Sequence, residues 1–474
     1  MLDGLPNEVV AEILETYVAQ ILNPIPGTLP KLNHKEKMQA IMRVALINQR
    51  IRDIALSRPA IWRTIYLHVR PQIVELFFER SHQEQILLYL DLCYGGSHAE
   101  NQTEERERQT TFLRTNMPAF QHLGIRLRNV EGAEAVSEAL QTPAPNLQSL
   151  DFDFSTQDMP CHTNLFAHSA PNLQTAKLFS KVPWHLSPFP SLSAVSARIG
   201  QRNCRKILST LLSLPGLETI NLTGNVEPGD VPLDPPPHPA VFASCRRLKL
   251  EKFEANCVLR LLPQLRLPAL TSLHIHEGPT ALETPTVPMT IFTTTITDTL
   301  ISLPGPRILP SSISISIHPR RLIIETNGTP SIRYLCDWRI AGYTPGPLDP
   351  LIFNAVSALC TALSTIPNVN VSELSILYNI RDNFPERTAL SCMDIEFIFY
   401  RVMEAYPQIN RLHLSGNVEK LVRYLCADPD LLSSQPRLEL VPDLTSAVTL
   451  VPNLVYLEAI TGCEIQVLPR HPLA

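Results

Sequence analysis

A short phrase that begins with proline recurs along most of the chain and limits the fold more than any other sequence feature. In each copy, leucine stands two positions after the proline, and apolar residues then follow at alternating positions. Neighbouring copies are mostly about 19–27 residues apart, which is near the period of known strand-and-helix repeats. Copies begin at residues 145, 171, 190, 215, 268 and 452, and looser copies cover 245–250 and 408–414.

Each copy predicts a turn followed by a short strand with one apolar and one polar face. The chain is also predicted to be helical before several copies, at 205–214, 258–262 and 395–406. One strand and one helix cannot enclose a core, so neighbouring units must stack on one another. We therefore predict an α/β array of stacked repeats over residues 69–474.

Proline content supports short elements rather than long ones. The chain has 43 prolines among 474 residues, and proline disrupts helix interiors and central strands. Proline-rich segments predict insertions in the array near 231–240, 279–310 and 342–350. Isoleucine and serine alternate over 313–317, which predicts a strand with one polar face, and a second strand is predicted from residue 320.

The first 68 residues have a different, helical pattern. Leu5, Val9, Ile13 and Tyr17 recur every four residues, and further apolar positions widen this stripe, which predicts an amphipathic helix. A second helix is predicted over 38–46 with Asn33 as its cap, and a third over 50–56, which proline then ends. Three helices of this length form a marginal domain, so either the array or a partner must cover their excess apolar surface.

These N-terminal residues resemble the F-box family in order and spacing. The similarity rests on Leu5-Pro6-x-Glu8-Val9, then Ile13-Leu14, and then the run from Ile51 to Trp62 that contains Pro59. The family usually has tryptophan where Ile51 stands. The resemblance implies that these helices dock on the adaptor protein Skp1, and through it on a cullin of a ubiquitin ligase. The adaptor-binding residues that it implies are Leu5, Pro6, Val9, Ile13, Leu14, Ile47, Ile51, Ile54 and Trp62.

The array is similar to leucine-rich repeats, and the whole chain resembles the large fungal-type F-box proteins. We therefore expect an α/β protein. A small all-α, three-helix F-box-like head (1–68) precedes an irregular leucine-rich-repeat-like α/β solenoid (69–474). The implied function is that of a substrate receptor, which docks the adaptor through the head and a target protein of unknown identity through the repeats. A binding scaffold unconnected with ubiquitination remains the alternative, as does a head that only caps the array.

Other functional classes have weaker support. Phosphate-binding loops and hydrolase motifs are absent from the sequence, so we expect no enzyme activity and no cofactor. His274 and His276 flank a strand position and could bind zinc, but no third ligand at strand spacing accompanies them. Short basic clusters at 202–206 and 320–321 and the charged run 104–108 are expected to be exposed.

Charge and hydropathy indicate the setting. A formal net charge of −5 and a pI near 6.3 argue against nucleic acid as a partner. The N-terminus lacks the pattern of a secretory signal, and no apolar stretch is long enough to span a membrane. We expect a protein of the cytoplasm, the nucleus or both, with no membrane partner.

Overall fold

The repeated phrase folds into the same local structure in each described copy of the computed structural model. The leucine of each phrase is buried, and its N–H donates to the carbonyl oxygen three residues earlier at 3.1–3.3 Å, which closes a turn before the strand. These leucines are Leu147, Leu173, Leu192, Leu217 and Leu270. The structure describes residues 4–22, 33–82, 85–92, 99–127, 133–154, 164–179, 186–199, 204–224, 240–253, 258, 261–277, 311–318, 321–329, 331–337, 371–378, 402, 405–406, 411–416 and 439–442.

The protein is a mixed α/β structure whose strands pair mostly in parallel. Its chain divides into two compact units: unit 1 is Met1–Arg198 with Lys206–Leu217, and unit 2 is Ile199–Arg205 with Glu218–Ala474. The insertions predicted near 279–310 and 342–350 lie outside the described residues, as does the one near 231–240 apart from Ala240.

Unit 1 begins with four helices, which we call the head: α1 (Asn7–Leu22), α2 (His34–Val44), α3 (Gln49–Leu56) and α4 (Pro59–Trp62). Asn33 caps α2 as predicted, because its side chain accepts from the N–H of Glu36 while the Glu36 carboxylate accepts from the N–H of Asn33. The head differs from the three-helix prediction at Pro59. This residue does not simply end α3, since it occupies the first turn of the short helix α4.

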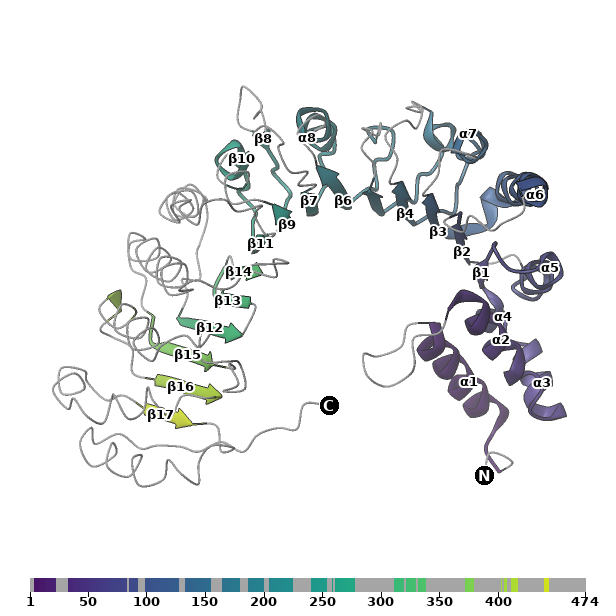
Figure 1. Ribbon diagram of the computed structural model, residues 1–474, viewed down its shortest axis with the longest axis horizontal. Helices are drawn as coiled ribbons and strands as arrows, with labels where there is room; N and C mark the ends of the chain where they lie inside the picture. Colours follow the sequence, from purple (N-terminus) through teal and green to yellow (C-terminus); the bar gives the residue numbers. More distant parts are fainter. Residues whose placement is uncertain are drawn as a thin grey trace. The chain divides into compact units, whose positions relative to one another are not determined.

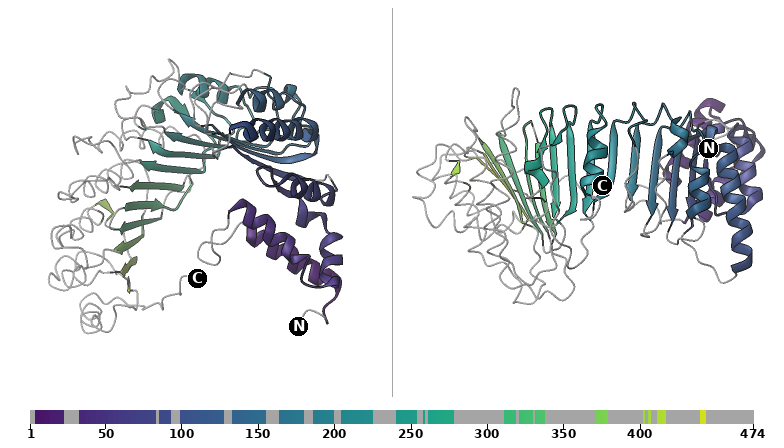
Figure 2. Two further views of the ribbon diagram at one scale, coloured as in Figure 1. Left: turned by 45° about the vertical axis from the view of Figure 1, so that its right-hand side comes forward. Right: turned by 90° about the horizontal axis from the view of Figure 1, so that it is seen from above.

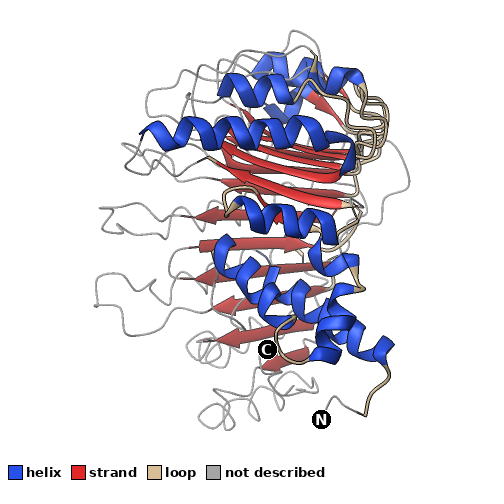
Figure 3. Cartoon of the chain, turned by 90° about the vertical axis from the view of Figure 1, so that its right-hand side faces the viewer, coloured by secondary structure: helices blue, strands red, loops and turns tan. Residues whose placement is uncertain are grey.

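The described strands that follow the head in unit 1 are parallel, and they pair in sequence order. Helices lie along one face of this sheet, as Figures 1 and 3 show for α5, α6 and α7. The strands are β1 (Thr64–Tyr66), β2 (Ile86–Asp91), β3 (Phe120–Leu127), β4 (Ser149–Phe154), β5 (Thr175–Phe179) and β6 (Ala194–Ile199). The helices are α5 (Pro71–Arg80), α6 (Ala99–Asn116), α7 (Ala133–Ala139) and α8 (Cys204–Leu212).

Side chains along these strands point alternately to the two faces of the sheet, so the sheet has a core face and an open face. One register row consists entirely of buried side chains and faces the helices. Its members are Ile65, Leu88, Leu123, Leu150, Ala176 and Val195. The adjacent row, which includes Tyr89, Asp151 and Lys177, lies on the opposite, open face, because successive side chains in a strand point to opposite sides.

Two described copies of the phrase have asparagine after the proline, and each of these side chains connects its turn to the preceding one. Asn146 Nδ2 donates to the carbonyl oxygen of Pro118, and Asn172 Nδ2 donates to that of Pro145, both at 2.8 Å. Each asparagine therefore satisfies a carbonyl of the preceding turn.

Within its described residues, unit 2 has strands in the order β7-β9-β11-β14-β13-β12-β15-β16-β17 and a separate pair, β8 and β10. The predicted strand at 313–317 is β12, and the second predicted strand is β13. Strand β13 runs antiparallel to both its neighbours, whereas the other described pairs of this order are parallel. Figure 2 shows these strands side by side. Their bounds are β7 (Thr219–Gly224), β8 (Ala240–Val241), β9 (Arg247–Phe253), β10 (Leu265–Arg266), β11 (Ser272–Glu277), β12 (Ser312–His318), β13 (Arg321–Thr326), β14 (Ser331–Asp337), β15 (Glu373–Tyr378), β16 (Arg411–Gly416) and β17 (Glu439–Pro442).

Candidate functional site

Helix α1 has apolar side chains on two sides, and only one of these sides is covered. The buried side packs into the head and consists of Val10, Ala11, Leu14, Val18 and Ile21. The other side is a stripe with one apolar residue per turn: Leu5, Val9, Ile13 and Tyr17 are 36%, 40%, 41% and 47% exposed. We call these four residues the α1 stripe.

Two further apolar side chains are exposed in the turn between α2 and α3. Leu46 is 68% exposed and Ile47 is 62% exposed. Arg50 connects the start of α3 to the start of α1, since its Nε donates to Asn7 Oδ1 at 3.0 Å and its Nη2 donates to the carbonyl oxygen of Leu5. This bridge holds the turn near the first residues of the α1 stripe.

A polar cavity of about 700 Å³ adjoins this bridge. Its lining is polar or charged except for Ile54, and it includes Arg50, Asp53 and Arg58. An apolar patch beside a polar rim is the usual composition of a protein–protein interface. The head therefore has the chemistry of a surface that another polypeptide covers.

Four of the residues expected to contact the adaptor lie in the interior of the head instead. Leu14, Ile51 and Ile54 are at most 6% exposed, and Trp62 is fully buried. Their side chains cannot touch a partner unless the head opens. Of the expected contacts, Leu5, Pro6, Val9, Ile13 and Ile47 are exposed.

Trp62 joins the head to the first repeat. Its ring meets Phe77 of α5 edge to face, with centroids 5.1 Å apart, and Arg80 lies over it at 4.5 Å. A single residue, Arg63, separates the end of α4 from the start of β1. Such a short connection leaves little freedom between the head and the strands of unit 1.

Two histidines pack at the same junction, on the open face of β1. The ring of His34, at the start of α2, stacks on Tyr66 with centroids 4.3 Å apart, and its Nδ1 lies 3.2 Å from Nε2 of His68. Burial is the main factor that lowers the pKa of His34 to about 4, and burial also lowers the pKa of His68. Both rings are therefore neutral near pH 7.

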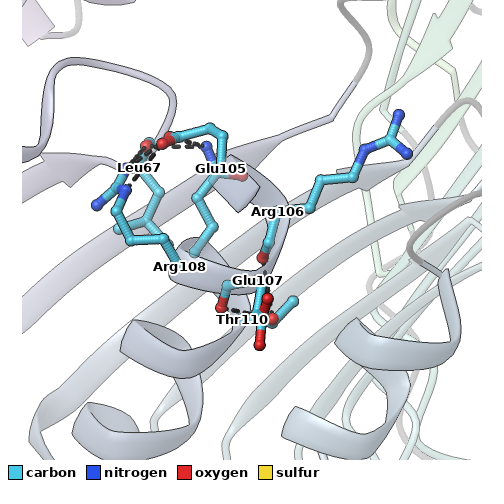
Figure 4. A network of polar contacts seen from close by, with 7 residues as sticks. Leu67, Glu105, Arg106, Glu107, Arg108 and Thr110 are labelled. Carbon is cyan, nitrogen blue, oxygen red and sulfur yellow. Dashed lines mark hydrogen bonds and ion pairs between the residues drawn. The ribbon is translucent and has the colours of Figure 1, made fainter. Parts of the chain in front are cut away.

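The charged run 104–108 is expected to be exposed, but the structure corrects this prediction in part. Side chains of the run hold helix α6 on the residue that follows β1 (Figure 4). Arg108 Nη2 and Gln109 Nε2 both donate to the carbonyl oxygen of Leu67, at 3.3 and 3.2 Å. The carboxylate of Glu105 accepts from both side chains in turn, at 2.5 and 2.7 Å. Helix α6 is thus fixed to the residue that follows β1.

The structure brings together few residues that could carry other chemistry. His274 and His276 lie on the same face of β11, as predicted. Among the described residues, no group of three or more potential ligands could hold a metal ion. Most side chains of the two predicted basic clusters lie outside the described part of the chain; Lys206 is exposed.

No family model matches this chain, and no curated protein matches it. No helix in the described ranges is long and apolar enough to cross a bilayer. The α1 stripe, with the turn at Leu46 and Ile47, is therefore the candidate site on structural grounds alone.

Proposed function

We propose that the chain is a substrate receptor of a Skp1–cullin–F-box type ubiquitin ligase. The head docks on Skp1, and the repeat array, read as a leucine-rich-repeat-like solenoid, holds a target protein. The observation that carries the proposal is the α1 stripe, which remains exposed although the opposite side of the same helix is buried. The sequence resemblance to the F-box supplies the identity of the partner.

The stripe fits a helical partner because its residues are four apart, the spacing by which a helix presents anchors to an apolar groove. Fully burying a large apolar side chain contributes about 1.5–3 kcal/mol, so side chains already more than half covered would each add about 1 kcal/mol. Four such residues, with Leu46 and Ile47, form a credible centre for a specific interface.

The junction supports the same role for unit 1. Since only Arg63 separates α4 from β1, and Trp62 and Gln109 fix both sides of this connection, an adaptor on the head would stand at a fixed position relative to these strands. A ligase needs such positioning to deliver ubiquitin to a bound target. The polar open face of the strands is the surface that we assign to the target.

The test is direct binding of the purified full chain to purified Skp1. We expect binding that depends weakly on salt, because the contacts are apolar. Val9→Asp and Ile13→Asp should each weaken binding at least tenfold, and Leu5→Ala and Pro6→Ala should weaken it less. Glu12→Gln, at an exposed position of the same helix, is the matched control and should bind normally. Failure of the wild type to bind, or equal binding by Val9→Asp and Ile13→Asp, contradicts the proposal.

Ile51 favours a second candidate function. It stands where the family has tryptophan, and it is 3% exposed rather than available to a partner. The alternative is a repeat-based binding scaffold outside the ubiquitin system, whose α1 stripe binds another helical protein. This alternative would be supported by a folded chain that does not bind Skp1 at any salt concentration but binds a different partner through Val9 and Ile13.

A further inference from the structure

One asparagine side chain joins the start of β12 to the end of β13 in unit 2. Asn327 follows β13, and its Oδ1 accepts hydrogen bonds from the N–H groups of Ser311 and Ser312, at 2.8 and 2.7 Å. Its Nδ2 donates to Ser311 Oγ at 3.0 Å, and its own N–H donates to the carbonyl oxygen of Ser312 at 3.3 Å. Two main-chain donors therefore hold the amide oxygen of an exposed asparagine.

The residue that follows Asn327 is glycine, and this is the only Asn-Gly pair in the sequence. Gly328 has a φ of 128°, in a region that glycine adopts far more easily than other residues. No side chain hinders its backbone nitrogen, and the N–H makes no hydrogen bond to another described residue. This nitrogen is therefore available to react with a neighbouring carbonyl carbon.

The neighbouring carbon is Cγ of Asn327, because attack on it by the Gly328 nitrogen closes a five-membered ring. The attack converts the amide oxygen into an oxyanion. Donors about 2.7–3.1 Å from such an oxygen stabilise it and lower the barrier to acyl transfer. The N–H groups of Ser311 and Ser312 already lie at these distances from Oδ1. Because they belong to the main chain, they need no rearrangement when the charge develops.

We propose that Asn327 is a site of spontaneous deamidation, which the main chain of Ser311 and Ser312 promotes. The Gly328 nitrogen bonds to Cγ of Asn327 and gives up its proton, and the Cγ–Nδ2 bond breaks. Ammonia leaves with that proton, and a succinimide ring remains. Water then opens the ring at either of its two carbonyl carbons, which gives aspartate or isoaspartate. In the net reaction water replaces ammonia, and no other reactant is needed.

The two products change this part of unit 2 in different ways, although each adds a negative charge. In aspartate the carboxylate can keep both main-chain donors, which bind an anion more strongly than an amide. In isoaspartate the former Cγ becomes part of the main chain, so the connection between β13 and β14 is one carbon longer. The isoaspartate form should therefore loosen the pairing of β12 with β13.

This inference does not depend on the proposed receptor function, because it concerns a reaction of the chain with water. The experiment is peptide-mapping mass spectrometry of the purified full chain after incubation in neutral buffer, with protein isoaspartyl methyltransferase to detect isoaspartate. We expect Asn327 to convert faster in the folded chain than in the same chain unfolded in guanidinium chloride, because unfolding removes both donors. Asn146 and Asn172, which precede leucine, are internal controls and should remain amides.

A pair of variants at Ser312 tests the donors directly. Ser312→Pro removes one N–H at the first residue of β12, a position where a strand tolerates proline. Ser312→Ala is the matched control, because it removes the same side chain and keeps the N–H. Conversion of Asn327 should be at least about tenfold slower in Ser312→Pro than in Ser312→Ala, since loss of one oxyanion donor slows acyl transfer by this much or more.

Thermal unfolding shows whether both Ser312 variants fold, and the comparison of folded with unfolded wild type needs no variant. The proposal is overturned if Asn327 remains an amide in the folded chain. It is also overturned if the unfolded chain converts as fast as the folded one, or if the two folded Ser312 variants convert at the same rate.

Discussion

The indole Nε1 of Trp62 donates a hydrogen bond of 2.8 Å to the carbonyl oxygen of Ala55. This bond ties the last helix of the head to α3, while the other side of the same ring packs on Phe77 of α5. Trp62 is therefore part of the structure that holds the head on the strands that follow it.

Trp62→Ala should lower the free energy of unfolding by about 3–5 kcal/mol, as expected when a fully buried aromatic side chain is removed. Trp62→Phe should cost less, because most of the packing remains and the Ala55 carbonyl, which loses the indole, still accepts a hydrogen bond from the N–H of Arg58 at 3.3 Å. Denaturant unfolding followed by circular dichroism measures both. A Trp62→Ala chain as stable as the wild type would contradict the structural role of this residue.

Adjacent residues of α1 should respond to truncation in opposite ways. Leu14→Ala should destabilise the chain by about 2–5 kcal/mol, because Leu14 is 5% exposed. Ile13→Ala should change stability by less than about 1 kcal/mol, because Ile13 is 41% exposed. Thermal unfolding of the two variants compares them directly. Equal losses would mean that the α1 stripe is covered by the chain itself.

A bulge in the neighbouring strand β9 comes so close to Gly224 that a larger residue would not fit there. A Cβ at Gly224 would lie 2.6 Å from the carbonyl oxygen of Lys252, whose φ of 57° places it in the left-handed region. The strand pairing skips Lys252 between Glu251 and Phe253, as in a β-bulge. Gly224→Ala should therefore cost about 1–3 kcal/mol.

The control for Gly224 is Gly216→Ala, where the nearest atom to a new Cβ is 3.9 Å away. This change should be close to neutral in the same thermal unfolding assay. Lys252→Gly should relieve the left-handed strain and partly rescue Gly224→Ala. A Gly224→Ala chain with unchanged stability would argue against the close contact.

Stability should fall in mild acid because of the junction histidines. Their pKa values are lower in the folded chain than the usual 6.5, and that of His34 is about 4. The unfolded chain therefore binds more protons between these values, so the free energy of unfolding falls as pH drops from about 6.5 to about 4 and is fully regained above 6.5. Water screens His34, so its share is about 1 kcal/mol.

His34→Phe tests this pH dependence, because phenylalanine can keep the stack on Tyr66 but cannot be protonated. The difference in melting temperature between the wild type and this variant should shrink or reverse as pH falls from 6.5 to 4. A difference that stays constant over this range would show that His34 is not held neutral by its surroundings.

The sequence predicted local structure well, but it did not predict which side chains are buried by segments distant in the chain. The cap at Asn33 and the strand at 313–317 followed from short patterns, and both are confirmed. Helix α1 has apolar residues around more than half of its circumference, so periodicity could not show that Leu14 faces inward while Ile13 faces outward. Only the packing of the other head helices decides between these two sides.

The candidate site was also only partly predictable for a physical reason. A resemblance gives positions in a motif, and a motif mixes residues that stabilise a small domain with residues that contact its partner. In this structure Ile51, Ile54 and Trp62 are buried and stabilise the head. Val9 and Ile47 are exposed and are available to a partner.

The reversed strand β13 has a consequence for how unit 2 assembles. Contacts between most neighbouring strands close loops of about 25 residues, as between Thr271 and Arg246. The contacts on either side of the β12–β13–β14 meander close loops of 60 and 61 residues. Loop-closure entropy grows with length, whereas the meander pairs only local segments. The meander can therefore form early as an independent nucleus, and the rest of unit 2 is then added from both of its edges rather than from one end.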